Sequence, residues 1–182
     1  MKRLITLVLL AGGMLWVGAA DKPRVSRASL AAMEKSFDGR LEGWSVDEPV
    51  MLLGTTRGVY LEGYGVVFTA EMNLLPGATI SPFQPTIKPE QRVRVHKKKL
   101  ERLPKLRVQM KDMLVASALS LDNVPLDDRI VVGVTLFHFS WEDGSGLPAQ
   151  VIMQAQRRLL LDYALKRIDL AALEAGIRTE EL

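Results

Sequence analysis

The segment LFHFSWEDGSG, residues 136–146, holds the side chains with the clearest capacity for catalysis: a histidine, a serine, a tryptophan and two acids within its first eight residues. A nucleophile, a base and an orienting acid are the parts of a hydrolase site when they lie within hydrogen-bond reach. Strand alternation puts His138 and Ser140 on the same face, but side chains two residues apart on a strand stand about 7 Å apart. Ser140 is therefore a poor partner for His138.

A catalytic role for His138 requires a partner from a neighbouring strand. Glu62 and Tyr64 are the first candidates, with Glu71 and Gln154 as the others. The alternative is a half-buried histidine that is hydrogen-bonded across the sheet, and we favour it because reactive histidines normally belong to a cluster. The sequence therefore favours a protein that is not an enzyme, with an exported hydrolase centred on His138 as the alternative.

Other catalytic and cofactor chemistry finds little support in the sequence. There is no cysteine, which excludes thiol catalysis, thiolate metal sites, disulfides and the acylated cysteine of a lipoprotein. The chain has no HxxxH, HxH or Asp-x-Asp-x-Asp pattern of metal ligands, and no Gly-rich phosphate-binding loop. We expect no metal and no cofactor.

A basic run is the most unusual feature of the sequence. Between residues 92 and 107, eight Lys or Arg residues accompany a single acid, Glu101. The basic residues are Arg92, Arg94, Lys97, Lys98, Lys99, Arg102, Lys105 and Arg107. As a helix, this run would meet an anionic surface: phospholipid headgroups, an acidic envelope polymer or an acidic partner protein. Nucleic acid is a less expected partner, because no aromatic residue is interleaved for base stacking.

The basic run also has an alternative interpretation that involves no partner. Long basic side chains commonly cover the apolar stripe of their own helix and pair with acids of the same domain. Outside this run the chain has more acids than bases. A solvated helix face therefore remains open as an explanation, and the sequence favours it slightly.

The first twenty residues, MKRLITLVLLAGGMLWVGAA, have the layout of a bacterial signal peptide: a charged start, an apolar run and small residues at the end. We expect residues 1–20 to direct export to the periplasm or the medium, and residues 21–182 to form a single domain. The alternative is an uncleaved anchor, since the uncharged run approaches the length of a spanning helix. We expect no transmembrane segment after cleavage.

Hydrophobic periodicity predicts the elements of this domain. Helices are expected at about 26–41, 89–121 and 157–177, and Pro104 should kink or divide the second of them. Strands are expected at 59–74, as one long strand or a bent pair, and as a hairpin at 129–141 and 149–156. Gly63 and Gly65 indicate a bulge or a close backbone approach.

These elements predict an α+β fold: an antiparallel sheet of about four to five strands, packed against a long kinked helix and N- and C-terminal helices. The expected function is that of an exported, envelope-associated binding protein that uses the basic helix 92–107 as its contact surface. A structural component that assembles through exposed strand edges is a further alternative.

Overall fold

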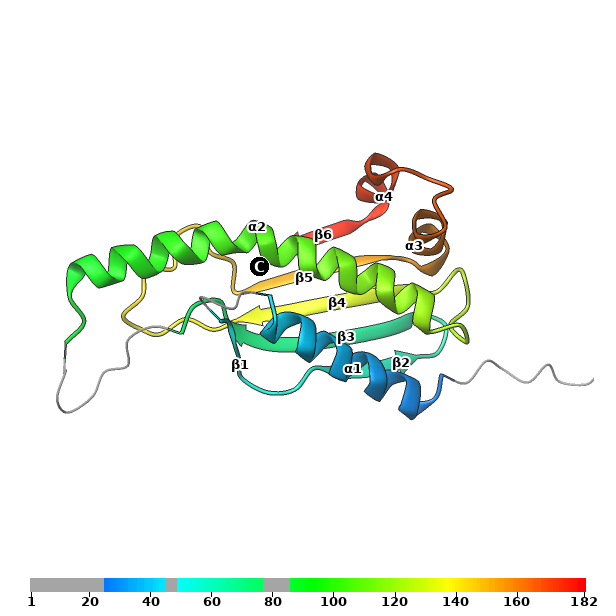
Figure 1. Ribbon diagram of the computed structural model, residues 1–182, viewed down its shortest axis with the longest axis horizontal. Helices are drawn as coiled ribbons and strands as arrows, with labels where there is room; N and C mark the ends of the chain where they lie inside the picture. The colour runs from blue at the N-terminus through cyan, green and yellow to red at the C-terminus, as the bar shows by residue number, and fades with distance from the viewer. Residues whose placement is uncertain (1–24, 45–48, 77–85) are drawn as a thin grey trace, which may run out of the picture.

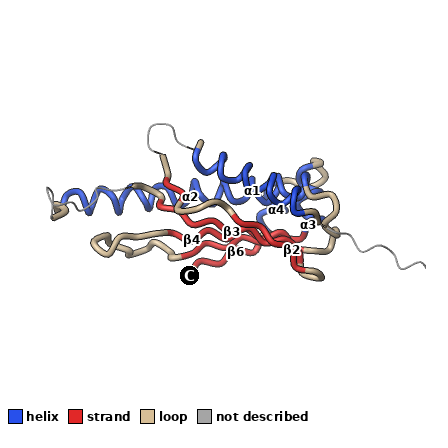
Figure 2. Tube along the Cα trace, turned by 90° about the horizontal axis from the view of Figure 1, so that it is seen from below, coloured by secondary structure: helices blue, strands red, loops and turns tan. Residues whose placement is uncertain are grey.

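The computed structural model describes residues 25–44, 49–76 and 86–182. It is an α+β fold in which helices cover one face of a six-stranded sheet, and no helix of the described residues covers the other face (Figures 1 and 2). The elements in chain order are α1 (Arg27–Glu42), β1 (Met51–Leu52), β2 (Arg57–Leu61), β3 (Gly65–Asn73), α2 (Pro89–Ser120), β4 (Arg129–Leu136), β5 (Gln150–Gln156), α3 (Arg157–Ala164), α4 (Leu170–Gly176) and β6 (Arg178–Glu181).

The sheet is mixed, which corrects the purely antiparallel sheet expected from the sequence. Its order is β1-β3-β4-β5-β6, and β2 pairs with β3 beside β1. β3 and β4 run parallel because α2 connects them, and a helical crossover returns the chain in the same direction. All other strand pairs are antiparallel. β2, β3, β4 and β5 lie where strands are expected, and the additional strands β1 and β6 bring the sheet to six instead of the expected four to five.

The first β segment is a bent pair, one of the two forms expected for residues 59–74, and not one long strand. β2 and β3 are antiparallel and joined at residues 62–64, where Gly63 has a φ of 76°. Gly65 has a φ of 134°, and a Cβ atom there would lie 1.9 Å from the carbonyl oxygen of Arg129. The close backbone approach is therefore confirmed, and it joins the start of β3 to the start of β4.

The core lies between the sheet and the helices. β3 and β4 direct alternate apolar side chains at the helices, including Phe68, Met72 and Val132, which are all buried. α1 begins at the cap Ser26, whose hydroxyl accepts from the Ser29 amide, and its apolar stripe packs on the sheet with Phe37 edge-on to Phe68. The stripe predicted for this helix, at Leu30, Met33, Phe37 and Leu41, is buried throughout.

α2 is one continuous helix, so of the two effects expected of Pro104, a kink or a division, the division does not occur. Its 32 residues correspond to a length of about 48 Å. Pro104 lacks an amide hydrogen and cannot donate to the Leu100 carbonyl. Both residues are exposed, so water can reach that carbonyl and the helix continues past the proline.

The C-terminal region differs from the single helix that was expected. It forms two short helices, α3 and α4, and then an edge strand, β6, which pairs with β5. Lys166 has a φ of 58°, which ends the first helix, and the Asp169 carboxylate caps the second by accepting from the Ala172 amide. β6 was missed because its residues, RTEE, show no apolar alternation.

The predicted signal peptide, residues 1–20, lies outside the described residues. Within the described ranges, no helix has the length and apolar character to cross a membrane.

Candidate functional site

The N-terminal half of α2 extends beyond the ends of the strands and lies along the loop that joins β4 to β5 (Figures 1 and 2). This loop, residues 137–149, contains most of the segment that looked catalytic in the sequence. β4 ends at Leu136, so His138 and Ser140 are loop residues and not strand residues as expected. His96 of α2 joins the two segments through a contact of 2.9 Å between its Nδ1 and the Asp143 carbonyl oxygen.

A buried ion pair fixes this loop to the helix. Lys99 Nζ donates to the Glu142 carboxylate, and it also donates to the Phe137 carbonyl oxygen at 3.1 Å. The side chains of Lys99 and Glu142 are 0% and 1% exposed. Burial lowers the pKa of the Lys99 ammonium by more than its bond to Glu142 raises it. The pair therefore holds two charges out of water at the base of the loop.

His138 completes this cluster. Its Nδ1 is 3.6 Å from Glu142 Oε2, and its Nε2 is 3.5 Å from the Pro148 carbonyl oxygen. His138 Nδ1 and Glu142 Oε1 are buried and make no hydrogen bond within the part of the chain that the structure describes. The imidazole therefore lies between a carboxylate that is already paired with Lys99 and a backbone carbonyl.

The structure does not bring Glu62, Tyr64 or Gln154 to His138. Glu71 of β3 lies opposite Thr135, at the His138 end of the sheet, but it makes no hydrogen bond or ion pair with His138 in the described residues. Glu62 and Tyr64 lie in the turn between β2 and β3, and the Tyr64 carbonyl accepts from the Arg129 amide at the start of β4. His138 follows the opposite end of β4, and the strand spans about 26 Å at its rise per residue. Gln154 lies with Tyr64 and accepts from Arg129 at 2.9 Å. Glu142, which follows His138 by four residues, is the carboxylate that the sequence reasoning missed.

The residues of the basic run differ in their burial. Lys99 and Arg102 point inward, and Arg102 donates to the Leu74 carbonyl oxygen; burial lowers the pKa of its guanidinium. Arg107 pairs with Glu181 of β6 at 2.6 and 3.0 Å. Lys98 is half-buried. The exposed contact surface is thus smaller than the expected eight residues. Helical spacing predicts the burial of Lys99 and Arg102, because positions 99, 102, 103 and 106 share one stripe.

Four members of the run remain exposed: Arg92, Arg94, Lys97 and Lys105. Their side chains form no ion pair within the described ranges. At 3.6 residues per turn, Arg94, Lys97 and Lys105 fall within an arc of about 80° on the side of α2 away from the core. We call these four residues the outer cations.

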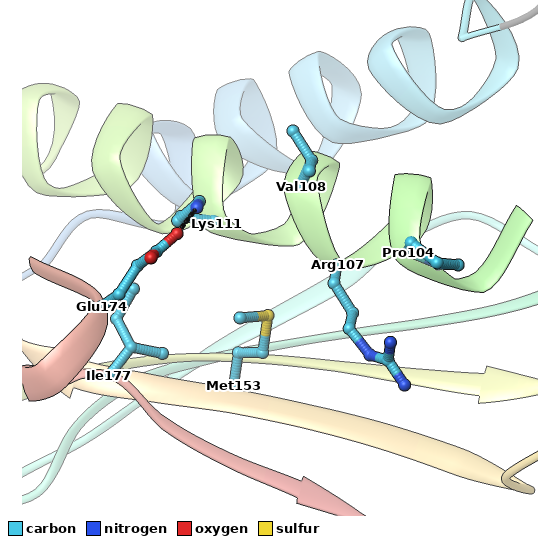
Figure 3. A pocket seen from close by; sticks show the side chains of 7 residues that line it. All are labelled: Pro104, Arg107, Val108, Lys111, Met153, Glu174 and Ile177. Atoms are coloured by element: carbon cyan, nitrogen blue, oxygen red, sulfur yellow. Dashed lines mark hydrogen bonds and ion pairs between the residues drawn. The ribbon is translucent and has the colours of Figure 1, made fainter. Parts of the chain in front are cut away.

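A shallow groove of about 280 Å³ lies between α2 and the C-terminal segment (Figure 3). Its lining residues are Pro104, Arg107, Val108, Lys111, Met153, Glu174 and Ile177. Lys111 pairs with Glu174, and Arg107 pairs with Glu181. The charges at the groove are therefore already neutralised by each other, and its floor is formed by Met153 and Ile177.

No group of three or more potential metal ligands occurs among residues 25–44, 49–76 and 86–182. No protein-family model, curated protein or solved structure matches this chain.

Proposed function

We propose that this protein is an exported, non-catalytic protein of the bacterial envelope, and that it binds an anionic surface through the outer cations of α2. The single observation that carries this proposal is the exposure of Arg92, Arg94, Lys97 and Lys105 on one projecting helix, without ion pairs in the described residues. Phospholipid headgroups are the surface on which the proposal is most easily tested.

The buried members of the basic run support the same proposal by a different route. Lys99 and Arg102 hold the projecting half of α2 to the loop 137–149 and to the Leu74 carbonyl. The outer cations therefore sit on a helix whose orientation is fixed by buried contacts. A fixed array of charges loses less conformational entropy on binding than a flexible basic tail does.

The size of the effect follows from surface electrostatics. Each cation near an anionic leaflet contributes about 1 kcal/mol, and the attraction falls off within a Debye length. Four outer cations therefore give binding that is measurable at low ionic strength and weak at high ionic strength.

The experiment measures co-sedimentation with vesicles of phosphatidylglycerol and phosphatidylcholine at low salt. The variant Arg94→Glu/Lys97→Glu/Lys105→Glu is expected to lose retention on the anionic vesicles. The matched control, Lys35→Glu/Arg40→Glu/Lys166→Glu, changes the net charge by the same amount at exposed positions outside α2. It is expected to retain most of the binding.

Equal loss in both triple variants would show that net charge alone drives retention, and it would contradict a specific role for α2. Unchanged retention in the α2 variant would contradict the proposal entirely.

The alternative function, an exported hydrolase, is favoured by one observation: the Glu142 carboxylate lies 3.6 Å from His138 Nδ1, which resembles the acid–base half of a triad. Against it, Glu142 is already engaged by Lys99, and Glu62, Tyr64 and Gln154 are at the other end of the sheet. Hydrolysis of ester or phosphoester substrates that is abolished by His138→Ala would support this alternative.

A further inference from the structure

The last strand, β6, forms one edge of the sheet (Figure 1). Within the described residues it pairs with β5 alone, and three of its four residues are exposed. The ion pair between Glu181 and Arg107 of α2 joins this strand to the helix layer. β6 is therefore an edge strand that this ion pair anchors to the helix layer, and its residues are accessible to solvent.

The hydrogen bonds beside β6 show which of its backbone groups are free to pair. Leu182 and Gln150 exchange both of their backbone hydrogen bonds, at 3.0 and 3.1 Å. Such pairs alternate along an antiparallel ladder, so Glu180 and Arg178 also direct their N–H and C=O groups at β5. The N–H and C=O groups of Thr179 and Glu181 consequently point away from the sheet.

We infer that β6 pairs antiparallel with β6 of a second copy of this chain, about a two-fold axis that passes between the two Thr179 residues and is normal to the sheet. Thr179 then exchanges both backbone hydrogen bonds with Thr179 of the second copy. Glu181 donates to the Ile177 carbonyl of the second copy. The two sheets become one continuous sheet.

The side chains select this register. Arg178 and Glu180 lie on the helix-free face of the sheet, opposite Gln154 and Ile152 of β5. A two-fold axis at Thr179 places each Arg178 directly opposite Glu180 of the other copy. Axes at Arg178, Glu180 or Glu181 instead place two like charges opposite each other, which is destabilising.

A short charged edge strand usually prevents edge-to-edge association. In β6, however, the two charges on the same face have opposite signs. A second copy of β6 therefore meets like charges in most registers and opposite charges in one. Arg178 and Glu180 already form an ion pair at 2.8 Å within the chain, with 67% and 36% of their side chains exposed. Exposed pairs of this kind are weak, so exchanging them for pairs across the two-fold axis costs little.

The symmetry has a consequence for the proposed function. Because the axis is normal to the sheet, the helices of both copies lie on the same side of the continuous sheet. Both sets of outer cations then lie on one side of the dimer, and two linked binding sites bind a surface more tightly than one. The dimer itself does not depend on anion binding.

The test uses the absence of cysteine. Thr179→Cys introduces a single thiol at the axis, where the Cα atoms of an antiparallel hydrogen-bonded pair lie about 5.5 Å apart, within the range for a disulfide. We expect the variant to form covalent dimers under mild oxidation or with a short bis-maleimide. Ser36→Cys, which is exposed on α1, is the control and should form no covalent dimer, although it still associates through β6.

Charge exchange tests the register. In sedimentation velocity, Arg178→Glu should weaken self-association at least about tenfold, since two cross-strand pairs become repulsive. The double variant Arg178→Glu/Glu180→Arg should restore it, with unchanged circular dichroism. A monomeric wild-type protein, equal cross-linking of the two cysteine variants, or no recovery in the double variant would each overturn the inference. Vesicle retention is measured separately, so failure of the dimer and failure of the proposed function are distinguishable.

Discussion

Lys99 of α2 and Glu142 of the loop 137–149 form an ion pair in which neither side chain is more than 1% exposed. Placing two charges in the interior is costly unless each compensates the other. The pair joins the most basic helix of the chain to the segment that contains His138. It therefore connects the two strongest candidates for function in the sequence, the basic run 92–107 and the segment 136–146.

Replacing Glu142 by Gln should destabilise the protein by about 3–5 kcal/mol, because Lys99 is left buried without a counter-charge. The measurement is the free energy of unfolding from urea denaturation followed by circular dichroism. Asp162→Asn, which breaks the more exposed pair with Arg167, is the matched control and should cost less than about 1 kcal/mol.

The double variant Lys99→Met/Glu142→Leu should recover most of this loss, since it removes both charges and fills the site with apolar atoms. If Glu142→Gln cost no more than the control, the ion pair would not be what holds the loop 137–149 to α2.

Acid should weaken the contact between α1 and β2. The Glu34 carboxylate accepts from Arg27 at 2.6 Å and from the Gly58 amide at 2.6 Å, and the bond from Arg27 is the main cause that lowers its pKa below the ordinary 4.5. A lowered folded-state pKa stabilises the fold fully above the unfolded-state pKa, and this contribution is lost as pH falls through the folded-state pKa.

Unfolding free energy measured from neutral pH downward should therefore decrease below about pH 4.5, and the part due to Glu34 should be absent in Glu34→Gln. Parallel curves for the wild type and the variant would contradict this assignment.

Gly65→Ala should destabilise the fold by at least about 2 kcal/mol, because φ at this position is 134° and an added Cβ atom would meet the Arg129 backbone. Gly39→Ala is the control, and its change in stability is expected to have the opposite sign. Gly39 lies inside α1 with open space around it, and alanine there should stabilise the helix by about 0.5–1 kcal/mol. A neutral Gly65→Ala variant would show that β3 and β4 can separate at their starts.

Much of the fold could be predicted because its core follows simple periodicity. The stripe Leu30, Met33, Phe37 and Leu41 identifies α1, and alternation identifies the apolar faces of β3, β4 and β5. The direction of β4 relative to β3 could not be read from alternation, because a parallel and an antiparallel partner bury the same residues. β6 has no apolar pattern, and its position depends on backbone pairing with β5.

The candidate site could be predicted less well. Lys99 and Arg102 were placed on a contact surface because of their charge, although their helical positions put them beside Leu103 and Leu106 on the buried stripe. His138 was assigned to a strand and its partner was sought on another strand. The chain instead turns after Leu136 and brings Glu142 back to it, a local contact that strand alternation does not describe.

Binding of α2 to an anionic surface is best measured as the partition of the purified wild-type protein between buffer and vesicles as salt is raised. Retention is expected on phosphatidylglycerol vesicles at low ionic strength, with progressive loss toward high salt as the outer cations are screened and little retention on pure phosphatidylcholine. Equal partition onto both vesicle types, or binding that does not change with salt, would contradict it.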